Sequence, residues 1–224
     1  YMDIPKCSCR FASIIYKKRI LMLKANLFVK TLGLLALSIT TFIGIKAQTL
    51  IAHYPFNNTL APSVGNFGSA IITTAGSASV GSTSVCTNNL DDYGNGLKTP
   101  SITSLSTTSF QIDFVMNLTS LPTTHTGSPY HNALIIGSGE RYFGLKVTNN
   151  GKLRLLYNNA YYSNEASITL ITGVDYAIQL QYINGVAAIK VNNAVVLTVG
   201  LPALSSGSDK TIFLGDNPGA TGQV

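Results

Sequence analysis

The stretch "DYAIQLQYINGVAAIKVNNAVVLTV", Asp175–Val199, decides the fold class of this chain. Apolar and polar residues alternate along it, and the alternation is interrupted at Asn184-Gly185 and at Asn192-Asn193. A period of two is typical of a half-buried strand, whereas an amphipathic helix repeats about every 3.6 residues. Asn-Gly and Asn-Asn pairs between two such runs are typical of tight hairpin turns. The stretch therefore predicts three antiparallel strands that form a meander.

A second hairpin is predicted upstream, in "RYFGLKVTNNGKLRLLYNN", residues 141–159. Its turn is expected at Asn149-Asn150-Gly151, between two alternating runs. We expect three residues of the first run to face three of the second: Phe143, Leu145 and Val147 opposite Leu153, Leu155 and Tyr157.

The strand "SFQIDFVMN", Ser109–Asn117, alternates in the same way, with Phe110, Ile112, Phe114 and Met116 on one face and Gln111, Asp113 and Asn117 on the other. No window of about eleven residues after Gln48 shows a helical stripe. Roughly ten to twelve short strands at this spacing indicate a sandwich or a barrel. Because each strand has one clean apolar face, we predict an all-β fold, a two-sheet antiparallel β-sandwich.

The β-rich region is preceded by a basic and then apolar segment, "MLKANLFVKTLGLLALSITTFIGIKA", residues 22–47. Lys24 and Lys30 form its basic end, Leu32–Ile45 its apolar core and Ala47 a small residue for cleavage, which together predict a secretory signal peptide. An uncleaved membrane anchor is the alternative, but a core of about 14 residues is shorter than the roughly 20 that span a bilayer. We therefore expect a secreted protein, extracellular or at the cell surface, without a membrane segment after cleavage.

Residues 1–21 lie before the methionine that would start this signal peptide, and we interpret them as a misassigned upstream extension. The domain itself is then expected over residues 48–224. After residue 47 the chain has seven Lys and Arg against eight Asp and Glu, a formal net charge of −1. That balance argues against a nucleic-acid partner, since phosphates are bound by Lys- and Arg-rich surfaces. Cys86 is the one cysteine left, so no internal disulfide can form.

The order of the segments resembles a known family. An aromatic-Pro-Phe strand end leads into an Asn-rich turn in "AHYPFNNTLAPSVGNFGSA", residues 52–70, and "TTSFQIDFVMNLTSLP", residues 107–122, follows. "NALIIGSGERYFGLKVTNNGKLRL", residues 132–155, and then the meander complete the order. Over residues 50–219 the chain resembles LamG-like jelly-roll domains of the concanavalin A-like lectin/glucanase superfamily.

Two departures from this family are visible. Family members often have a Trp near the position of Tyr176, and this chain has none. The family pattern also continues beyond "LGDNPG", residues 214–219, into a last strand that returns toward the first one. We therefore expect the chain to be truncated at its C-terminus and to belong to a longer protein with further domains.

Enzymatic activity finds little support in the acidic residues. Glucanases of the superfamily place paired carboxylates on one strand, about 5 Å apart in retaining enzymes. After residue 47 the Glu residues are Glu140 and Glu165, in different segments, and Asp91 is adjacent to Asp92. We therefore expect a non-catalytic carbohydrate-binding or adhesion module of a bacterial-type surface protein. A fragment of a glycoside hydrolase of the same superfamily and a structural spacer domain are the alternatives.

Two polar-aromatic groups are the candidate ligand contacts. Aromatic faces beside amide side chains suit a glycan or surface polysaccharide, and they equally suit another surface protein. The alternative is that Tyr157, in phase with Leu153 and Leu155, belongs to the core. The candidates are Tyr157, Asn158, Asn159, Tyr161, Tyr162 and Asn164 in "LLYNNAYYSNEAS", and Tyr130 with His131 in "PYHN".

The family resemblance also implies a structural calcium ion, because many LamG-like domains carry one. Calcium prefers carboxylate, amide and carbonyl oxygens. The candidates are Asp91 and Asp92 in "NNLDDYGNG" and Asp216 and Asn217 in "LGDNPG". Turn formation alone is the alternative explanation for these clusters.

Overall fold

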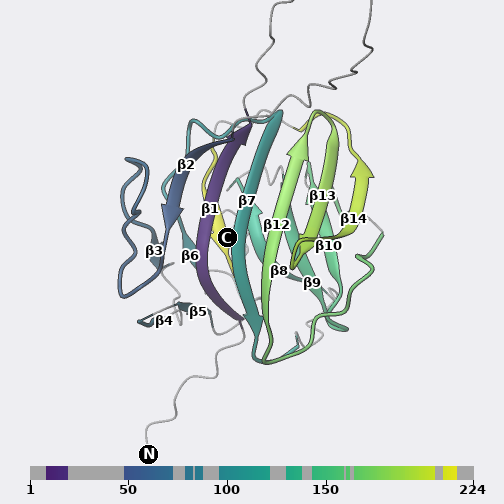
Figure 1. Ribbon diagram of the computed structural model, residues 1–224, viewed down its shortest axis with the longest axis horizontal. Coiled ribbons are helices and arrows are strands. Elements are labelled where there is room, and N and C mark those ends of the chain that lie inside the picture. Colours follow the sequence, from purple (N-terminus) through teal and green to yellow (C-terminus); the bar gives the residue numbers. More distant parts are fainter. Residues whose placement is uncertain are drawn as a thin grey trace, which may run out of the picture.

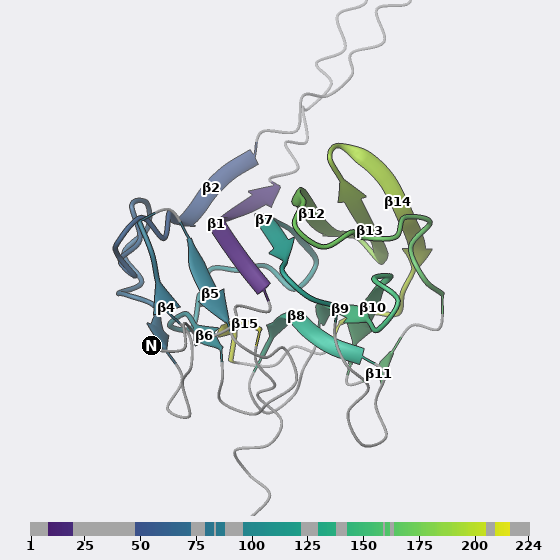
Figure 2. The same ribbon diagram turned by 90° about the horizontal axis from the view of Figure 1, so that it is seen from below.

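The structure is a computed structural model, and it describes residues 9–19, 48–72, 79–82, 84–87, 96–121, 130–137, 143–158, 160–161, 164–204 and 209–215. Within these ranges the chain forms fifteen strands and no helix. The described residues therefore contain no helix that is long and apolar enough to cross a membrane. The strands pair antiparallel in two sheets that pack face to face (Figures 1 and 2). The predicted all-β, two-sheet antiparallel sandwich is confirmed.

The two sheets, A and B, have eight and seven strands. Sheet A runs in the order β14 (Ala194–Gly200), β13 (Val186–Val191), β12 (Asp175–Ile183), β7 (Ser109–Leu118), β1 (Cys9–Arg19), β5 (Val85–Thr87) and β4 (Ser79–Val80), and β2 (Gln48–Tyr54) also pairs with β1. Sheet B runs in the order β11 (Ala160–Tyr161), β10 (Leu153–Tyr157), β9 (Phe143–Thr148), β8 (Tyr130–Ile136), β15 (Ile212–Leu214), β6 (Leu97–Lys98) and β3 (Ile71–Ile72).

The predicted hairpins are present, and the hairpin at residues 141–159 has the predicted register. In β9 and β10 the pairs are Val147 with Leu153, Leu145 with Leu155 and Phe143 with Tyr157. Gly151 closes this turn at a φ of 75°, and a Cβ there would lie 2.5 Å from the Leu170 carbonyl oxygen. Only glycine combines that backbone conformation with that close approach. The meander β12–β13–β14 also has its turns at the predicted asparagines, which adopt positive φ: Asn184, Asn192 and Asn193.

The core lies between the two sheets and follows from the alternation of the strands. In β7 the four residues predicted to face inward are all buried: Phe110, Ile112, Phe114 and Met116. Phe110 of sheet A meets Phe143 of sheet B edge to face, with ring centroids 5.2 Å apart. Tyr182 of β12 lies 5.8 Å from the same Phe143 ring. These contacts join the two sheets, because aromatic rings bury a large apolar area and favour this geometry.

Strand β1 was not expected, since the sequence analysis placed the domain over residues 48–224. In the structure β1 lies between β7 and β2 in the middle of sheet A (Figure 1). Ile14 is fully buried, opposite Phe114 on one side and Tyr54 on the other. The folded unit therefore includes Cys9–Arg19. The signal peptide at 22–47 and the misassignment of 1–21 remain predictions.

A β-bulge explains why the pattern of β1 escaped detection. Phe11 pairs with Met116 and Ile14 pairs with Phe114, so three steps along β1 match two steps along β7. The extra residue interrupts the period of two, which is the signal by which strands are found in a sequence.

We expect Ile14→Ala to lower the free energy of unfolding of the full chain by about 2–5 kcal/mol, because it leaves a cavity in a packed core. The matched control is Ile171→Ala, at a side chain that is 63% exposed. It should change stability by less than about 0.5 kcal/mol. Urea unfolding followed by circular dichroism measures both, and equal losses would contradict the placement of β1 in the core.

Tyr54 lowers the stability of the folded chain at alkaline pH. Burial raises the pKa of its hydroxyl from 10.0 to about 12, and this hydroxyl donates to the Gly68 carbonyl oxygen at 3.2 Å. Above pH 10 the unfolded chain releases this proton first, so the folded state binds more protons and stability falls as pH rises, by roughly 2–3 kcal/mol in all. We expect urea unfolding at about pH 9 and about pH 11 to show a smaller drop for Tyr54→Phe than for the wild type. An equal drop would contradict this role.

Candidate functional site

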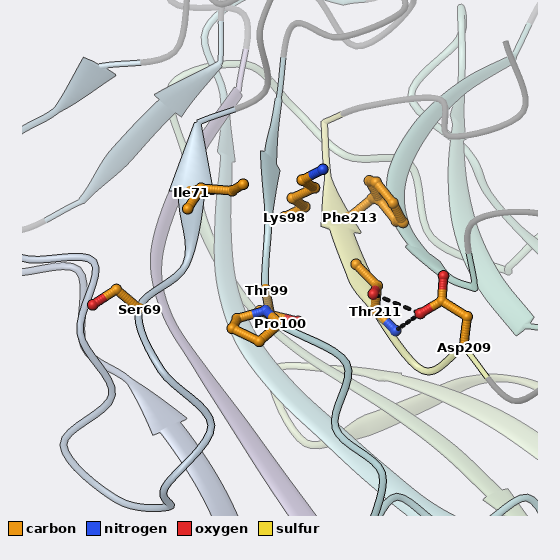
Figure 3. Close-up of a pocket in the computed structure, with 8 residues that line it drawn as sticks. All are labelled: Ser69, Ile71, Lys98, Thr99, Pro100, Asp209, Thr211 and Phe213. Carbon is orange, nitrogen blue, oxygen red and sulfur yellow. Dashed lines mark hydrogen bonds between the residues drawn. The ribbon is translucent and has the colours of Figure 1, made fainter. Parts of the chain in front are cut away.

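A cavity of about 280 Å³ lies where β3, β6 and β15 meet in sheet B, and we call it the β6–β15 pocket (Figure 3). Its position follows from the alternation of the strands. Ile212 and Leu214 of β15 are in the core, so Phe213 between them points to the opposite face. Leu97 of β6 is likewise in the core, and Lys98 is directed away from it. The pocket is lined by Ser69, Ile71, Lys98, Thr99, Pro100, Asp209, Thr211 and Phe213.

Strand register places three of these side chains in one row. Lys98 pairs with Phe213 on one side and with Ile71 on the other. Figure 3 shows Lys98 between these two apolar side chains. The row places an ammonium group beside an aromatic and an aliphatic wall. Ile71 is half exposed and Phe213 is buried, so the wall opens to solvent on the Ile71 side.

Hydrogen bonds hold the polar side of the pocket in place. Asp209 Oδ1 accepts from the Thr211 backbone N–H at 2.9 Å and from its hydroxyl at 2.6 Å. The buried Thr99 hydroxyl oxygen accepts from the Ile212 N–H at 3.1 Å. Lys210, which lies between Asp209 and Thr211 in the sequence, donates its Nζ to the carbonyl oxygens of Thr103 and Leu105. The segment before β15 is thus anchored on both sides of the chain, which preorganises the pocket.

The lining of this pocket carries the kinds of group with which proteins recognise small polar ligands. It offers an ammonium group, a carboxylate, several hydroxyls and an apolar wall, and small-molecule sites combine such groups. Its volume, about 280 Å³, is close to the lower end of the usual range for such sites, roughly 300 Å³. Asp209 is the one carboxylate among its lining residues, so the pair that glycoside hydrolysis needs is not formed by them.

A second cavity, of about 330 Å³, lies at one end of the sandwich, and we call it the end cavity. Its lining residues are Thr107, Thr108, Tyr182, Asn184, Gly185, Ala203 and Leu204. Asn158, a predicted ligand contact, donates its Nδ2 to the Ala203 carbonyl oxygen at 3.0 Å. This bond fixes the end of the β9–β10 hairpin against the cavity wall.

The two predicted polar-aromatic groups do not form one site. Tyr157 pairs with Phe143 at the start of β9, whereas Tyr130 pairs with Thr148 at its end. These two partner positions are five residues apart along β9, which places the two tyrosines roughly 17 Å apart along the strand direction. Tyr157 also packs against the core, which agrees with the alternative interpretation.

The remaining candidates are placed in part. Asn164 is exposed, Tyr161 pairs with Leu156 through the backbone, and His131 pairs with Val147. The side chains of Tyr130, His131 and Tyr161 lie outside the described part of the chain. The candidates that lie wholly outside the described residues are Asn159, Tyr162 and the proposed calcium ligands Asp91, Asp92, Asp216 and Asn217.

Sequence reasoning missed a polar ladder on the outer face of sheet A. Gln111 donates its Nε2 to both oxygens of Asp113, at 2.7 and 2.9 Å. From the neighbouring strand, Gln179 donates to Asp113 at 3.0 Å and Gln181 donates to Gln111 at 2.6 Å. The alternation of β7 placed Gln111 and Asp113 outward, but the pairing with β12 joins residues about 70 positions apart, which no local pattern shows.

Glu165, a candidate acid of the hydrolase alternative, is held in an ion pair. Its Oε1 accepts from Arg154 Nη2 at 2.8 Å and from Nε at 3.2 Å. Both side chains are partly exposed. Glu140 lies outside the described residues.

Comparison with known proteins gives one informative likeness. No protein-family model and no curated protein matches the chain. Among solved structures, the chain is similar to domain 4 of AbnA, a GH43 extracellular arabinanase from Geobacillus stearothermophilus, in complex with arabinotriose. The TM-score is 0.54 and the identity 18%, over 72% of this chain and 80% of that one. At this identity the likeness shows a shared β-sandwich fold, and a fold alone does not fix a function.

We expect Asp209→Ala to lower the free energy of unfolding by about 1–3 kcal/mol, because the Thr211 N–H and hydroxyl lose their acceptor. Asp209→Asn keeps an amide oxygen at the position of Oδ1 and should cost less. Urea unfolding of both variants at neutral pH measures the difference. Equal losses would mean that the charge of Asp209, and not its acceptor oxygen, stabilises the pocket.

Proposed function

We propose that the chain is a secreted, non-catalytic carbohydrate-binding or adhesion module of a bacterial-type surface protein, with a LamG-like fold. The β6–β15 pocket is its sugar subsite. The observation that carries this proposal is the composition of that pocket: Lys98 and Asp209 lie at a cavity with an apolar wall.

The pocket suits a sugar unit for a physical reason. A sugar ring has apolar C–H faces and a rim of hydroxyls, so its recognition needs an apolar wall beside donors and acceptors. Phe213 and Ile71 supply the wall, and Lys98 supplies a donor. The Ser69 hydroxyl can donate or accept, and the Thr211 hydroxyl, which donates to Asp209, can accept. The similar β-sandwich domain of the arabinanase was solved with an oligosaccharide, which supports a sugar ligand for this fold.

Two alternatives make different predictions. A glycoside hydrolase fragment would degrade a polysaccharide, and Glu165→Gln or Glu140→Gln would abolish this. The ion pair of Glu165 with Arg154 favours a structural role for that carboxylate. A spacer domain would bind no glycan and would depend on neighbouring domains of a longer protein.

We expect the full chain to bind a defined class of glycan, arabinan oligosaccharides included, on a glycan array. Lys98→Met should weaken that binding about tenfold or more, since a hydrogen bond to a charged group contributes roughly 1.5–3 kcal/mol. The matched control is Lys190→Met, on β13 of the other sheet, which should bind like the wild type. Equal binding by Lys98→Met and the control would contradict the pocket.

Two further arms of the experiment separate the remaining proposals. Asn158→Gly keeps the positive φ of 43° and removes the amide that holds the end cavity. If Asn158→Gly loses glycan binding and Lys98→Met keeps it, the ligand is assigned to the end cavity. The array is repeated with calcium and with a chelator, and loss of binding in chelator would support a calcium ion at Asp91, Asp92, Asp216 and Asn217. A folded chain that binds no glycan would favour a protein ligand or a spacer role.

A further inference from the structure

Strand β1 occupies a slot with two hydrogen-bonding edges, which we call the strand slot. One edge is β7, with which β1 shares eight residue pairs, from Cys9 with Leu118 to Lys18 with Phe110. The other edge is formed by β2, with six pairs from Ile14 to Arg19, and by β5, with three pairs from Cys9 to Phe11. Both edges present unpaired backbone groups if β1 is absent, and such edges attract extended chains.

Among the side chains of β1 that the structure describes, residues 13–15, Ile14 anchors the strand in this slot. Ile14 is fully buried, and its register partners Phe114 and Tyr54 are buried as well. The neighbouring Ile15 pairs with Asp113 and His53 and is only partly buried. Side chains at alternate positions are how a strand added to a sheet is recognised, while the backbone bonds supply affinity.

The connection of β1 to the rest of the chain does not dictate its position. β1 and β2 are paired neighbours, yet the 28 residues 20–47 separate them. Hairpins that set their own register use connections of about 2–5 residues. The register of β1 is therefore set by its pairing and by Ile14, as it would be for a separate peptide.

The charge of β1 suits the same interpretation. Cys9–Arg19 carries Arg10, Lys17, Lys18 and Arg19 and no acidic residue. In β7, Asp113 is the one charged residue, and it lies two positions from Gln111, the register partner of Lys17. A basic strand thus lies along an edge whose single charge is negative.

We propose that the strand slot is a peptide-binding site, which accepts in trans an extended basic strand with a β-branched apolar residue at the position of Ile14. Cys9–Arg19 is its occupant in this chain. The proposal is independent of the glycan site on sheet B.

The test uses the full chain with a site-specific protease sequence inserted between Leu21 and Met22. After cutting, we expect the fragment that contains β1 to co-elute with the rest on size exclusion. We also expect the cut chain to take up a fluorescent peptide of residues 9–19, measured by anisotropy in reducing buffer. The uncut chain, whose slot is filled in cis, should take up at least about tenfold less peptide.

Two peptide variants with the same substitution show whether the slot is specific. Ile14→Thr should compete at least about tenfold more weakly than the parent peptide, because it removes buried methyl groups and adds a hydroxyl to the core. Ile15→Thr should compete within about threefold of the parent. Equal competition by the two variants would overturn the proposal. So would a cut chain that stays folded by circular dichroism and takes up no peptide, or one that unfolds on cutting.

Discussion

The structure depends on one geometric constraint, the pleat of the strand, which sends successive side chains to opposite faces of a sheet. Each strand of the sandwich buries one face against the other sheet, and the residues between are thereby directed outward. In β15, burying Ile212 and Leu214 places Phe213 on the outer face, and in β6 burying Leu97 does the same for Lys98. The packing of the core therefore determines which side chains face outward and are available for a binding site.

The two outer faces use these side chains differently. On sheet A the side chains of Gln111 and Gln181 are almost fully buried; Gln181 donates to Gln111, and Gln111 donates to Asp113. Groups whose donors and acceptors already meet one another gain little from a ligand, since binding must first break those bonds. On sheet B, Asp209 accepts from Thr211, two residues further along the chain, while Lys98 lies at a cavity open on one side. This contrast favours the β6–β15 pocket over the ladder as the binding site.

What could be predicted from the sequence was local. The hairpin around Gly151 was predicted with its register and the meander with its two turns, because alternation and turn residues lie within a few positions of one another. The pocket could not be predicted, since Ser69, Lys98 and Asp209 come from three distant segments. Tyr157 was ambiguous for a related reason: its aromatic ring suits a ligand, but its phase matches the core residues Leu153 and Leu155. Strand β1 was missed because residues 1–21 precede the predicted start methionine, and because an extra residue between Phe11 and Ile14 interrupts its alternation.

The middle of sheet A is formed by strands that lie far apart in the sequence. β7 is paired with β12 on one side, about 60 residues further along, and with β1 on the other, about 100 residues earlier. Contacts between distant segments must close a long loop before they gain stability, so they form late in folding. The rim strands β13 and β14 are instead joined by a two-residue turn. The centre of sheet A is therefore formed by non-local pairing, whereas its rim hairpin is formed by local pairing.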